Sequence, residues 1–415
     1  MTEKVTFGSN PTARALSFVF GIGMAVFSII TIQHFFAANY PLTIYEGGIC
    51  DINAFFNCDG SAHSILSQVA GVPLGYFGLV VGVLVSMGAL FPSIDFERTN
   101  RSLALLNVVG VVALFLVSVF FLKSLCLYCS GFYVFSILSL VVFWKYPASD
   151  GSDGFVAKYF RPSFMHLATY GVLTLMGAYG FALYHSARKD AQTGGVATRI
   201  VREYYSLPRV EWPSFISPLR TAQATEKFED AAIRIVEFAD PLCVDCQFLA
   251  GQLEQLKDEF AEHLNLAFQM FPLEAQCNDV VEKDLHPGAC EISYIAAHDP
   301  SKFKAIHDEV FANMRSGRDP EWRLALAQRH GVEAAIQDSA TIAMVHRIIA
   351  TGAEYAKTSD QYEHGIRSTP TLIINNRMII GTLPYDQLRA IFQALVDEHE
   401  RGEGSQFIEN WAPRN

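Results

Sequence analysis

The chain has 415 residues, of which 51% are hydrophobic, and its mean hydropathy is +0.22, so two or three domains and a membrane part are expected. Residues 1 to 187 hold 8 Lys+Arg and 8 Asp+Glu, whereas residues 188 to 415 hold 23 and 34, so all of the net charge of −11 belongs to the C-terminal part. An acidic soluble part offers no basic patch for a phosphate backbone, which argues against nucleic acid as a partner.

Five stretches without Asp, Glu, Lys or Arg predict transmembrane helices, because about 20 apolar residues cross a bilayer. They are residues 15–45, 60–94, 102–122, 124–144 and 162–187. Only Lys123 separates the third from the fourth, and one helix through both would be about 65 Å long, roughly twice the hydrocarbon core. A turn near Lys123 is therefore expected. The first stretch is too long for a cleavable signal peptide, so it is expected to remain as an anchor.

Basic residues predict the orientation of these spans. With a cytoplasmic N-terminus, seven of the eight basic residues before residue 188 lie on the cytoplasmic side, and only Lys123 lies outside. The positive-inside rule favours this arrangement. Because five spans are an odd number, the C-terminal part is expected on the outer side of the membrane.

Eight cysteines form four close couples, and the predicted orientation places all of them in the outer compartment. The couples are Cys50 with Cys58, Cys126 with Cys129, Cys243 with Cys246, and Cys277 with Cys290. In a Cys-x-x-Cys pair one thiol attacks and the other resolves the mixed disulfide, and an even count suits an oxidising compartment. Three couples are therefore candidates for an electron relay, with zinc or structural disulfides as alternatives. The fourth couple lacks a helix start and predicts a structural disulfide; no metal is expected.

The soluble part is predicted to begin with a linker over residues 188–228, which contains a short helix through Arg202 and several prolines. A strand at residues 233–238 and a turn then lead to a helix at residues 243–263. This order places Cys243 at a helix N-terminus, where free amides and the helix dipole stabilise a thiolate. Strand, turn and Cys-x-x-Cys at a helix start form a thioredoxin layout.

The remaining pattern completes that layout. A strand at residues 264–271 precedes a helical region at residues 288–365, and a hairpin with Asn-Asn at its turn covers residues 368–381. A final helix is expected at residues 384–400. In thioredoxin folds a Thr-Pro before such a strand carries a cis peptide beside the active cysteine, so Thr369 and Pro370 are candidate substrate-binding residues.

These motifs resemble the vitamin K epoxide reductase family, in its bacterial form fused to a thioredoxin-like domain similar to DsbA. The residues that carry the resemblance are Cys-x7-Cys after the first span, Ser64, Gly71-Val72-Pro73 opening the second span, and Cys-x-x-Cys-x-x-x-Tyr ending at Tyr133. The expected fold is a four-helix membrane bundle plus a fifth transmembrane helix, followed by an α/β thioredoxin-like domain with a helical insertion. The expected boundaries are a membrane domain at 1–150, a cytoplasmic loop and fifth helix at 151–187, a linker at 188–228 and a thioredoxin-like domain at 229–402.

The resemblance implies a role for each cysteine of the membrane part. Cys129 corresponds to the thiol that reacts with a quinone, and Cys126 to its neighbour that exchanges with the loop. Cys58 corresponds to the thiol that accepts electrons from the thioredoxin-like domain, and Cys50 to the one that hands them to Cys126. A quinone, either ubiquinone or menaquinone, is the implied cofactor.

Other positions are implied to support this chemistry. Ser64 and Tyr133 fall where the family lines its quinone pocket, whereas Leu74 or Gly75 replaces an Asn found in some members. Glu237, six residues before Cys243, matches a buried acid thought to assist proton transfer.

The dipeptide between Cys243 and Cys246 departs from the pattern of a familiar strong oxidant. That oxidant has Pro-His there, whereas this chain has Val244 and Asp245. A carboxylate beside the thiolate is expected to raise the pKa of Cys243 and to make its disulfide less oxidising.

The expected protein is a quinone-dependent thiol-disulfide oxidoreductase of the bacterial inner membrane, with its thioredoxin-like domain outside the cytoplasm. Reduced extracytoplasmic proteins would be its thiol substrates, and the quinone pool and the lipid bilayer its other partners. The alternatives are a reductase or isomerase that delivers electrons outward, and a thioredoxin-like membrane sensor that binds partners without turnover.

Overall fold

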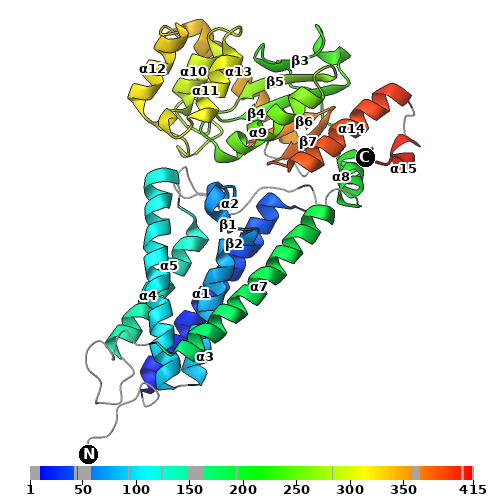
Figure 1. The fold of residues 1–415 in the computed structure, drawn as a ribbon. Coiled ribbons are helices and arrows are strands. Elements are labelled where there is room, and N and C mark those ends of the chain that lie inside the picture. Colours follow the sequence, from blue (N-terminus) through cyan, green and yellow to red (C-terminus); the bar gives the residue numbers. More distant parts are fainter. Residues whose placement is uncertain are drawn as a thin grey trace, which may run out of the picture. The chain divides into compact units, whose positions relative to one another are not determined.

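The computed structural model describes residues 10–41, 44, 58–91, 93–122, 125–146, 162–191, 195–282, 284–357, 365–402 and 406–413. The chain divides into two compact units, which Figure 1 draws as a ribbon. The helical unit comprises residues 1–39 and 55–189, and the α/β unit comprises residues 40–54 and 190–415. Cys50 and Lys123 lie outside the described residues.

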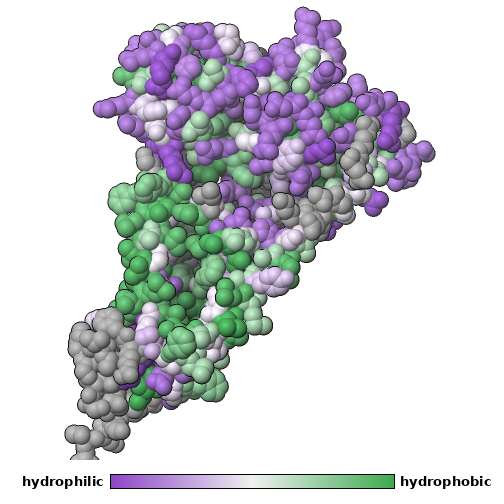
Figure 2. Space-filling model, in the orientation of Figure 1, coloured by the Kyte–Doolittle hydropathy of each residue, from purple (hydrophilic) through white to green (hydrophobic). Residues whose placement is uncertain are grey.

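Long apolar helices build the helical unit. They are α1 (Pro11–Asn39), α3 (Leu74–Leu90), α4 (Ile94–Leu116) with its π-helical continuation η3 (Val117–Leu122), α5 (Leu127–Lys145) and α7 (Phe164–Ala191). By length and composition α1, α4 with η3, α5 and α7 can each cross a membrane, and α3 is a shorter apolar helix of 17 residues. The helix formed by α4 and η3 ends at Leu122, and α5 begins at Leu127, so the third and fourth predicted spans are separate helices. Figure 2 shows hydrophobic residues over the visible surface of this unit, as a lipid environment requires.

The predicted second span differs from the structure at its start. Its first part folds as α2 (Asp59–Ala62), η2 (Ile65–Ser67) and a hairpin of β1 (Gln68–Val69) with β2 (Val72–Pro73). Ala70 and Gly71 at the hairpin turn have φ values of 49° and 80°, which a helix does not allow. The helix itself therefore starts at Leu74, directly after the Gly71-Val72-Pro73 motif.

Helix α1 packs against α3 and α5, and α4 packs against α3 and α5, which makes a four-helix bundle. Small residues allow the closest approach: a Cβ on Gly21 of α1 would lie 2.8 Å from the carbonyl oxygen of Gly82 on α3. Helix α7 joins the bundle through polar contacts, because the Tyr76 hydroxyl donates to the Thr174 carbonyl at 3.0 Å and His185 Nδ1 lies 2.8 Å from the Gly71 carbonyl oxygen.

A five-stranded sheet forms the centre of the α/β unit, with the order β3-β5-β4-β6-β7. The strands are β3 (Arg220–Gln223), β4 (Ile233–Ala239), β5 (Leu264–Met270), β6 (Thr371–Ile374) and β7 (Arg377–Ile380). Strands β4 and β5 are parallel, and every other pair is antiparallel. The predicted hairpin turn is confirmed, because Asn375 and Asn376 both have positive φ, as a tight hairpin requires.

Helices cover both faces of this sheet. They are α8 (Ala197–Ser206), α9 (Val244–Glu259), α10 (Ala289–Ala297), α11 (Phe303–Ala312), α12 (Pro320–His330), α13 (Ser339–Thr351), α14 (Tyr385–Arg401) and α15 (Phe407–Asn410), with the 3-10 turns η5 (Phe228–Asp230), η6 (Ser316–Arg318) and η7 (Gly352–Lys357). Alternate residues of β4 enter two cores: Ile235 packs with α8, α9 and α14, whereas Val236 packs with α10, α11 and α13.

The segment predicted as a linker is partly structured. Within residues 188–228, α8 buries Ile200 and Tyr204, and β3 pairs with β5 at the edge of the sheet. The hydroxyl of Tyr204 donates to the Ile374 carbonyl at 2.8 Å. The α/β unit therefore begins earlier than residue 229: α8 is the short helix predicted through Arg202, and only the edge strand β3 was not recognised among the prolines.

Candidate functional site

The dithiol of the helical unit lies at the start of α5. Cys126 is the N-cap of this helix, and its sulfur accepts a hydrogen bond from the Cys129 amide at 3.4 Å. The spacing of three residues places both thiols on one face of the first turn. The break between η3 and α5 thus creates the helix N-terminus that orients the Cys-x-x-Cys pair.

The sulfur atom of Cys58 contacts this dithiol. Cys58 is buried and disulfide-bonded, and its Sγ lies 3.3 Å from Cys126 Sγ. The resemblance assigned the exchange with Cys126 to Cys50. The structure brings Cys58 to Cys126, while Cys50 lies outside the described residues, so the order of transfer within the loop couple stays a prediction.

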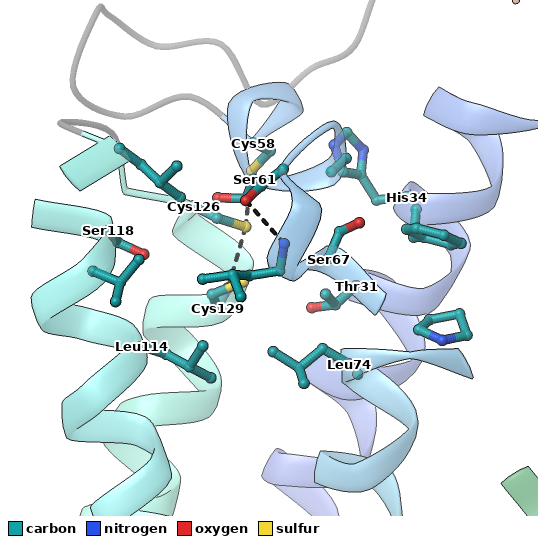
Figure 3. Close-up of a pocket in the computed structure, with 18 of the residues that line it drawn as sticks. Thr31, His34, Cys58, Ser61, Ser67, Leu74, Leu114, Ser118, Cys126 and Cys129 are labelled. Atoms are coloured by element: carbon teal, nitrogen blue, oxygen red, sulfur yellow. Dashed lines mark hydrogen bonds between the residues drawn. The ribbon is translucent and has the colours of Figure 1, made fainter. Parts of the chain in front are cut away.

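A cavity opens beside these sulfur atoms (Figure 3). Both residues that the resemblance assigned to a quinone pocket, Ser64 and Tyr133, line it. Its other lining residues are Thr31, His34, Phe35, Cys58, Ser61, Ala62, Leu66, Ser67, Pro73, Leu74, Gly75, Leu114, Val117, Ser118, Leu122, Cys126 and Cys129. Leu74 and Gly75 thus lie in the wall where some family members have an Asn, and this part of the wall is apolar.

A second cavity shares part of this wall. Cys129 and Tyr133 line both cavities, whereas Cys126 lines only the first. Asn107 and Phe132 are among the further residues of the second cavity. Cys129 therefore faces the larger apolar space and Cys126 faces Cys58. Sequence reasoning missed Thr31 and Ser118, because single hydroxyl residues on apolar helices carry no motif.

The dithiol of the α/β unit lies at the start of α9. Cys243 is the N-cap, its sulfur accepts from the Cys246 amide at 3.4 Å, and its thiol donates to the Thr369 carbonyl at 3.4 Å. The bond between Thr369 and Pro370 is cis, as predicted. The predicted neighbours of the active cysteine are thus brought together, while their role in binding substrate remains a prediction.

The two thiols of this pair differ in acidity. Burial raises the pKa of Cys243, but the hydrogen bond with Cys246 and the charge of His286 outweigh it, so that the pKa falls to about 7. Burial and the neighbouring Cys243 raise the pKa of Cys246 well above its ordinary value. This difference in acidity favours Cys243 as the attacking thiol and Cys246 as the resolving one.

The charged groups that act most strongly on Cys243 lie outside the dipeptide between the cysteines, and the expected effect of Asp245 stays a prediction. The carboxylate that raises the pKa of Cys243 is Asp240, in the turn before the helix, and the imidazole that lowers it is His286. A pKa of about 7 for Cys243 is typical of mild thioredoxin-like couples. Sequence reasoning missed both neighbours, since neither belongs to the Cys-x-x-Cys motif.

Glu237 is buried on β4, as expected from its spacing to Cys243. It shares a sheet face with Ile235, and that face is covered by α9. Burial raises the pKa of Glu237 to about 7, although the charge of Lys257 on α9 opposes this. A carboxyl group with this pKa exchanges protons readily near neutral pH.

The fourth cysteine couple is a disulfide between Cys277 and Cys290, as predicted, with Cα atoms 5.9 Å apart. Cys126, Cys129, Cys243 and Cys246 carry free thiols. Among the residues that the structure describes, no group of three or more His, Cys, Asp or Glu side chains is arranged to hold a metal ion.

Comparisons with known proteins agree with this architecture. Residues 228–394 match the model of a thioredoxin family. No curated protein sequence matches the chain. Among solved structures, a periplasmic thioredoxin-like protein from Salmonella enterica serovar Typhimurium is 16% identical, with 46% of this chain and 99% of that one covered and a TM-score of 0.35. The thiol-disulfide exchange protein alpha-DsbA2 from Wolbachia pipientis is 15% identical, with 50% and 98% covered and a TM-score of 0.32.

Residues 14–144, which contain Cys58, Cys126, Cys129 and most of the four-helix bundle, match the model of the vitamin K epoxide reductase family. Together the two matches leave out only the region around α7, α8 and β3, and the chain ends. The chain is a membrane protein that joins a domain of the vitamin K epoxide reductase family to a thioredoxin-like domain, and it is a thiol-disulfide oxidoreductase.

Proposed function

We propose that this oxidoreductase forms disulfides in extracytoplasmic proteins and passes their electrons to a membrane quinone. The observation that carries the proposal is the 3.3 Å contact between the sulfur atoms of Cys58 and Cys126, beside a cavity that Cys129 also lines. Sulfur atoms at this distance are placed for thiol-disulfide exchange, in which a thiolate attacks one sulfur of a disulfide and the other leaves as a thiolate.

The electron path begins at the thioredoxin-like domain. Substrate thiolates reduce the disulfide between Cys243 and Cys246 in two exchange steps, and the substrate leaves with a new disulfide. The reduced pair then reduces the loop couple that contains Cys58. Part of this loop belongs to the α/β unit: the Ile44 amide donates to Glu203 Oε2 at 3.0 Å, and Gln387 Nε2 donates to the Pro41 carbonyl.

The last protein step lies in the helical unit. The Cys58 thiolate attacks Cys126 of an oxidised Cys126–Cys129 pair, and Cys129 leaves as a thiolate that faces the cavity. The Cys50 thiolate would then attack Cys58 of the mixed disulfide and release Cys126 as a thiolate, so that Cys126 and Cys129 are both reduced. The residues that line the cavity would hold a quinone, which when bound would supply the two-electron acceptor for their re-oxidation to a disulfide. The cavity suits such a group, because its apolar walls fit a flat ring, while the hydroxyls of Ser64 and Tyr133 can donate to the ring's carbonyl oxygens.

The topology predicted from the basic residues belongs to this proposal. A cytoplasmic N-terminus places the start of α5 and the whole α/β unit on the outer side of a bacterial inner membrane. Reduced secreted proteins can then reach Cys243, and the quinone pool can reach Cys129.

Anaerobic quinone reduction by the purified protein tests the proposal. With a reduced, unfolded thiol protein as electron donor, the parent chain is expected to reduce a ubiquinone analogue, a menaquinone analogue or both. Cys129→Ser is expected to abolish this activity, whereas Tyr76→Phe, which changes a side chain outside both cavities, is the control. Undiminished turnover by the Cys129→Ser protein would rule out the proposed path.

A further inference from the structure

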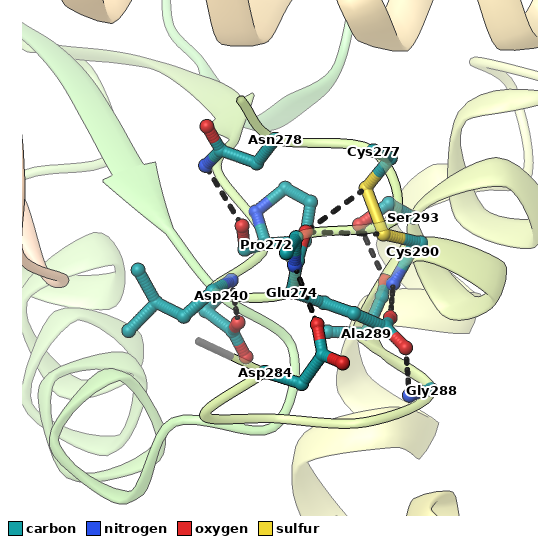
Figure 4. Close-up of a disulfide and its surroundings, with 12 residues drawn as sticks. Asp240, Pro272, Glu274, Cys277, Asn278, Asp284, Gly288, Ala289, Cys290 and Ser293 are labelled. Atoms are coloured by element: carbon teal, nitrogen blue, oxygen red, sulfur yellow. Dashed lines mark hydrogen bonds between the residues drawn. A yellow bond between two sulfur atoms is a disulfide. The ribbon is translucent and has the colours of Figure 1, made fainter. Parts of the chain in front are cut away.

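The Cys277–Cys290 disulfide closes a loop beside the dithiol of the α/β unit. The described part of this loop, residues 272–282 and 284–290, is called the disulfide loop. Glu274 organises it, because the Glu274 carboxylate accepts from the amides of Gly288 at 2.9 Å and Cys290 at 2.7 Å (Figure 4). Asn278 Nδ2 also donates to the Pro272 carbonyl at 2.8 Å. The two ends of the loop are thus held by a covalent bond and by hydrogen bonds.

Asp240 joins this loop to the turn that carries Cys243. Its side chain is fully buried, and the carboxylate accepts from the Leu242 amide at 2.6 Å and from the Leu273 amide at 2.5 Å. The amide of Cys243 in turn donates to the Asp240 carbonyl at 3.2 Å. One buried carboxylate therefore fixes the first residues of the disulfide loop relative to the attacking thiol.

His286 completes the arrangement from the far part of the loop. Its Nδ1 lies 3.0 Å from Asp240 Oδ1, its side chain is 8% exposed, and its amide donates to the Leu273 carbonyl at 3.0 Å. A buried imidazole in contact with a carboxylate is favoured in its charged form. This histidine lies four residues before Cys290, so the disulfide restricts the backbone that places it.

The charged groups around His286 come from the turn at Asp240, from Cys243 at the start of α9 and from η6. Burial lowers the pKa of His286, but Asp240 and the Cys243 thiolate raise it, Arg318 of η6 lowers it, and the net shift is upward. Cys246 on α9 is the remaining titratable group beside Cys243. Imidazolium and thiolate therefore stabilise each other, while Asp240 favours the first and opposes the second.

We propose that His286 is the electrostatic positioning residue of Cys243, and that the Cys277–Cys290 disulfide holds it in place. The inference goes beyond the electron path, since it depends only on Cys243 being the attacking thiol. When a second substrate thiolate attacks the mixed disulfide at the substrate sulfur, Cys243 leaves with the electron pair of the broken bond. The imidazolium stabilises that thiolate, which makes Cys243 a better leaving group and its disulfide a stronger oxidant.

The test measures how fast Cys243 reacts with iodoacetamide at each pH, in the reduced full chain in detergent, with the alkylated residue identified by mass spectrometry. His286→Gln is expected to move the midpoint upward by about one pH unit, so that alkylation at pH 6 is about tenfold slower. Its disulfide is also expected to be less oxidising in equilibrium with glutathione. An unchanged midpoint and potential would overturn the proposal. Neither readout involves a quinone, so failure here is distinct from failure of the proposed path.

His307→Gln is the matched control. His307 is also buried, and its Nδ1 lies 2.9 Å from the carboxylate of Asp308, but it belongs to α11 and is not among the main groups that shift the pKa of Cys243. This variant loses an imidazole–carboxylate pair without losing the charge beside the thiolate. The midpoint of Cys243 is expected to stay at the parent value. An equal shift in both variants would show a general loss of stability and overturn the proposal.

The role of the disulfide is tested with Cys277→Ser/Cys290→Ser. Its Cys243 midpoint is expected to shift in the same direction as in His286→Gln, and adding His286→Gln to it is expected to give a smaller further shift. Parent-like alkylation would overturn this part. If circular dichroism shows an unfolded domain, Glu274→Gln loosens the same loop with the disulfide intact, and it is expected to slow alkylation at pH 6; an unchanged rate would again contradict the proposal.

Discussion

The Sγ atoms of Cys58 and Cys126 lie 3.3 Å apart, although 68 residues separate them in the chain. Cys126 is fixed as the N-cap of α5, and Cys58 directly precedes α2 in the segment that caps the bundle. This geometry supports the proposal that the loop couple and the membrane couple exchange electrons through these two sulfur atoms.

Removing the partners of these two residues is expected to trap their mixed disulfide. In Cys50→Ser/Cys129→Ser neither resolving thiol remains, so the Cys58–Cys126 bond should accumulate on oxidation, as peptide mapping under non-reducing conditions can measure. Cys58→Ser/Cys129→Ser is the matched control, and it should form far less of a Cys50–Cys126 bond. A stronger cross-link in the control would restore the order that the family resemblance implied.

Local signals in the sequence were enough for most of the α/β unit. Alternating and continuous apolar residues located β4 and β5, and the Asn375-Asn376 pair located the turn between β6 and β7. Hydropathy was less informative in the helical unit. Residues 60–73 are as free of charge as a span, but Gly71 and Ala70 turn the backbone into a hairpin, and an average over apolar residues does not detect such a turn.

The residues of the candidate site likewise fall into those that local sequence signals located and those that they did not. Cysteine spacing and the Thr-Pro motif located both dithiols, because these features are contiguous in sequence. The contact between Asp240 and His286 spans 46 residues and depends on how the disulfide loop folds back on the turn before α9. No periodicity or motif connects such positions, so only the tertiary structure reveals that these two residues are the charged groups that act most strongly on Cys243.

Tyr133→Phe is expected to weaken quinone binding. Loss of one hydroxyl donor that faces the cavity should raise the KM for quinone about five- to tenfold, the effect of a hydrogen bond of about 1 to 1.5 kcal/mol, with a smaller change in kcat. Ser64→Ala should act in the same direction. Tyr76→Phe is the control, because Tyr76 donates to the Thr174 carbonyl outside both cavities. Equal KM values for Tyr133→Phe and Tyr76→Phe would remove Tyr133 from the binding site.

Cys246→Ala is expected to accumulate mixed disulfides between Cys243 and secreted thiol proteins. Without the resolving thiol, the bond formed by Cys243 persists, whereas Cys243→Ala should capture none. The measurement is non-reducing electrophoresis followed by identification of the linked peptides. A thioredoxin-like domain that only binds partners would give no covalent complexes in either variant, and that result would favour the sensor alternative.

Glu237→Gln is expected to change how the stability of the α/β unit depends on pH. Burial raises the pKa of Glu237 from 4.5 to about 7, so the folded state holds its proton more tightly than the unfolded state does. Stability from this group is complete below about pH 4.5 and is lost as the pH rises through about 7. The variant carries no such dependence. Its free energy of unfolding relative to the parent should therefore rise by about 2 to 3 kcal/mol between pH 5 and pH 8.

Tryptophan fluorescence during urea unfolding measures this difference. In a Trp144→Phe background, the three remaining tryptophans, Trp212, Trp322 and Trp411, all belong to the α/β unit and report on its unfolding. Glu333→Gln, at an exposed position of the same unit, is the control. A difference between Glu237→Gln and its parent that stays constant from pH 5 to pH 8 would show that Glu237 is ionised in the folded protein throughout this range. It could then not hold the proton that a relay to the thiols near neutral pH requires.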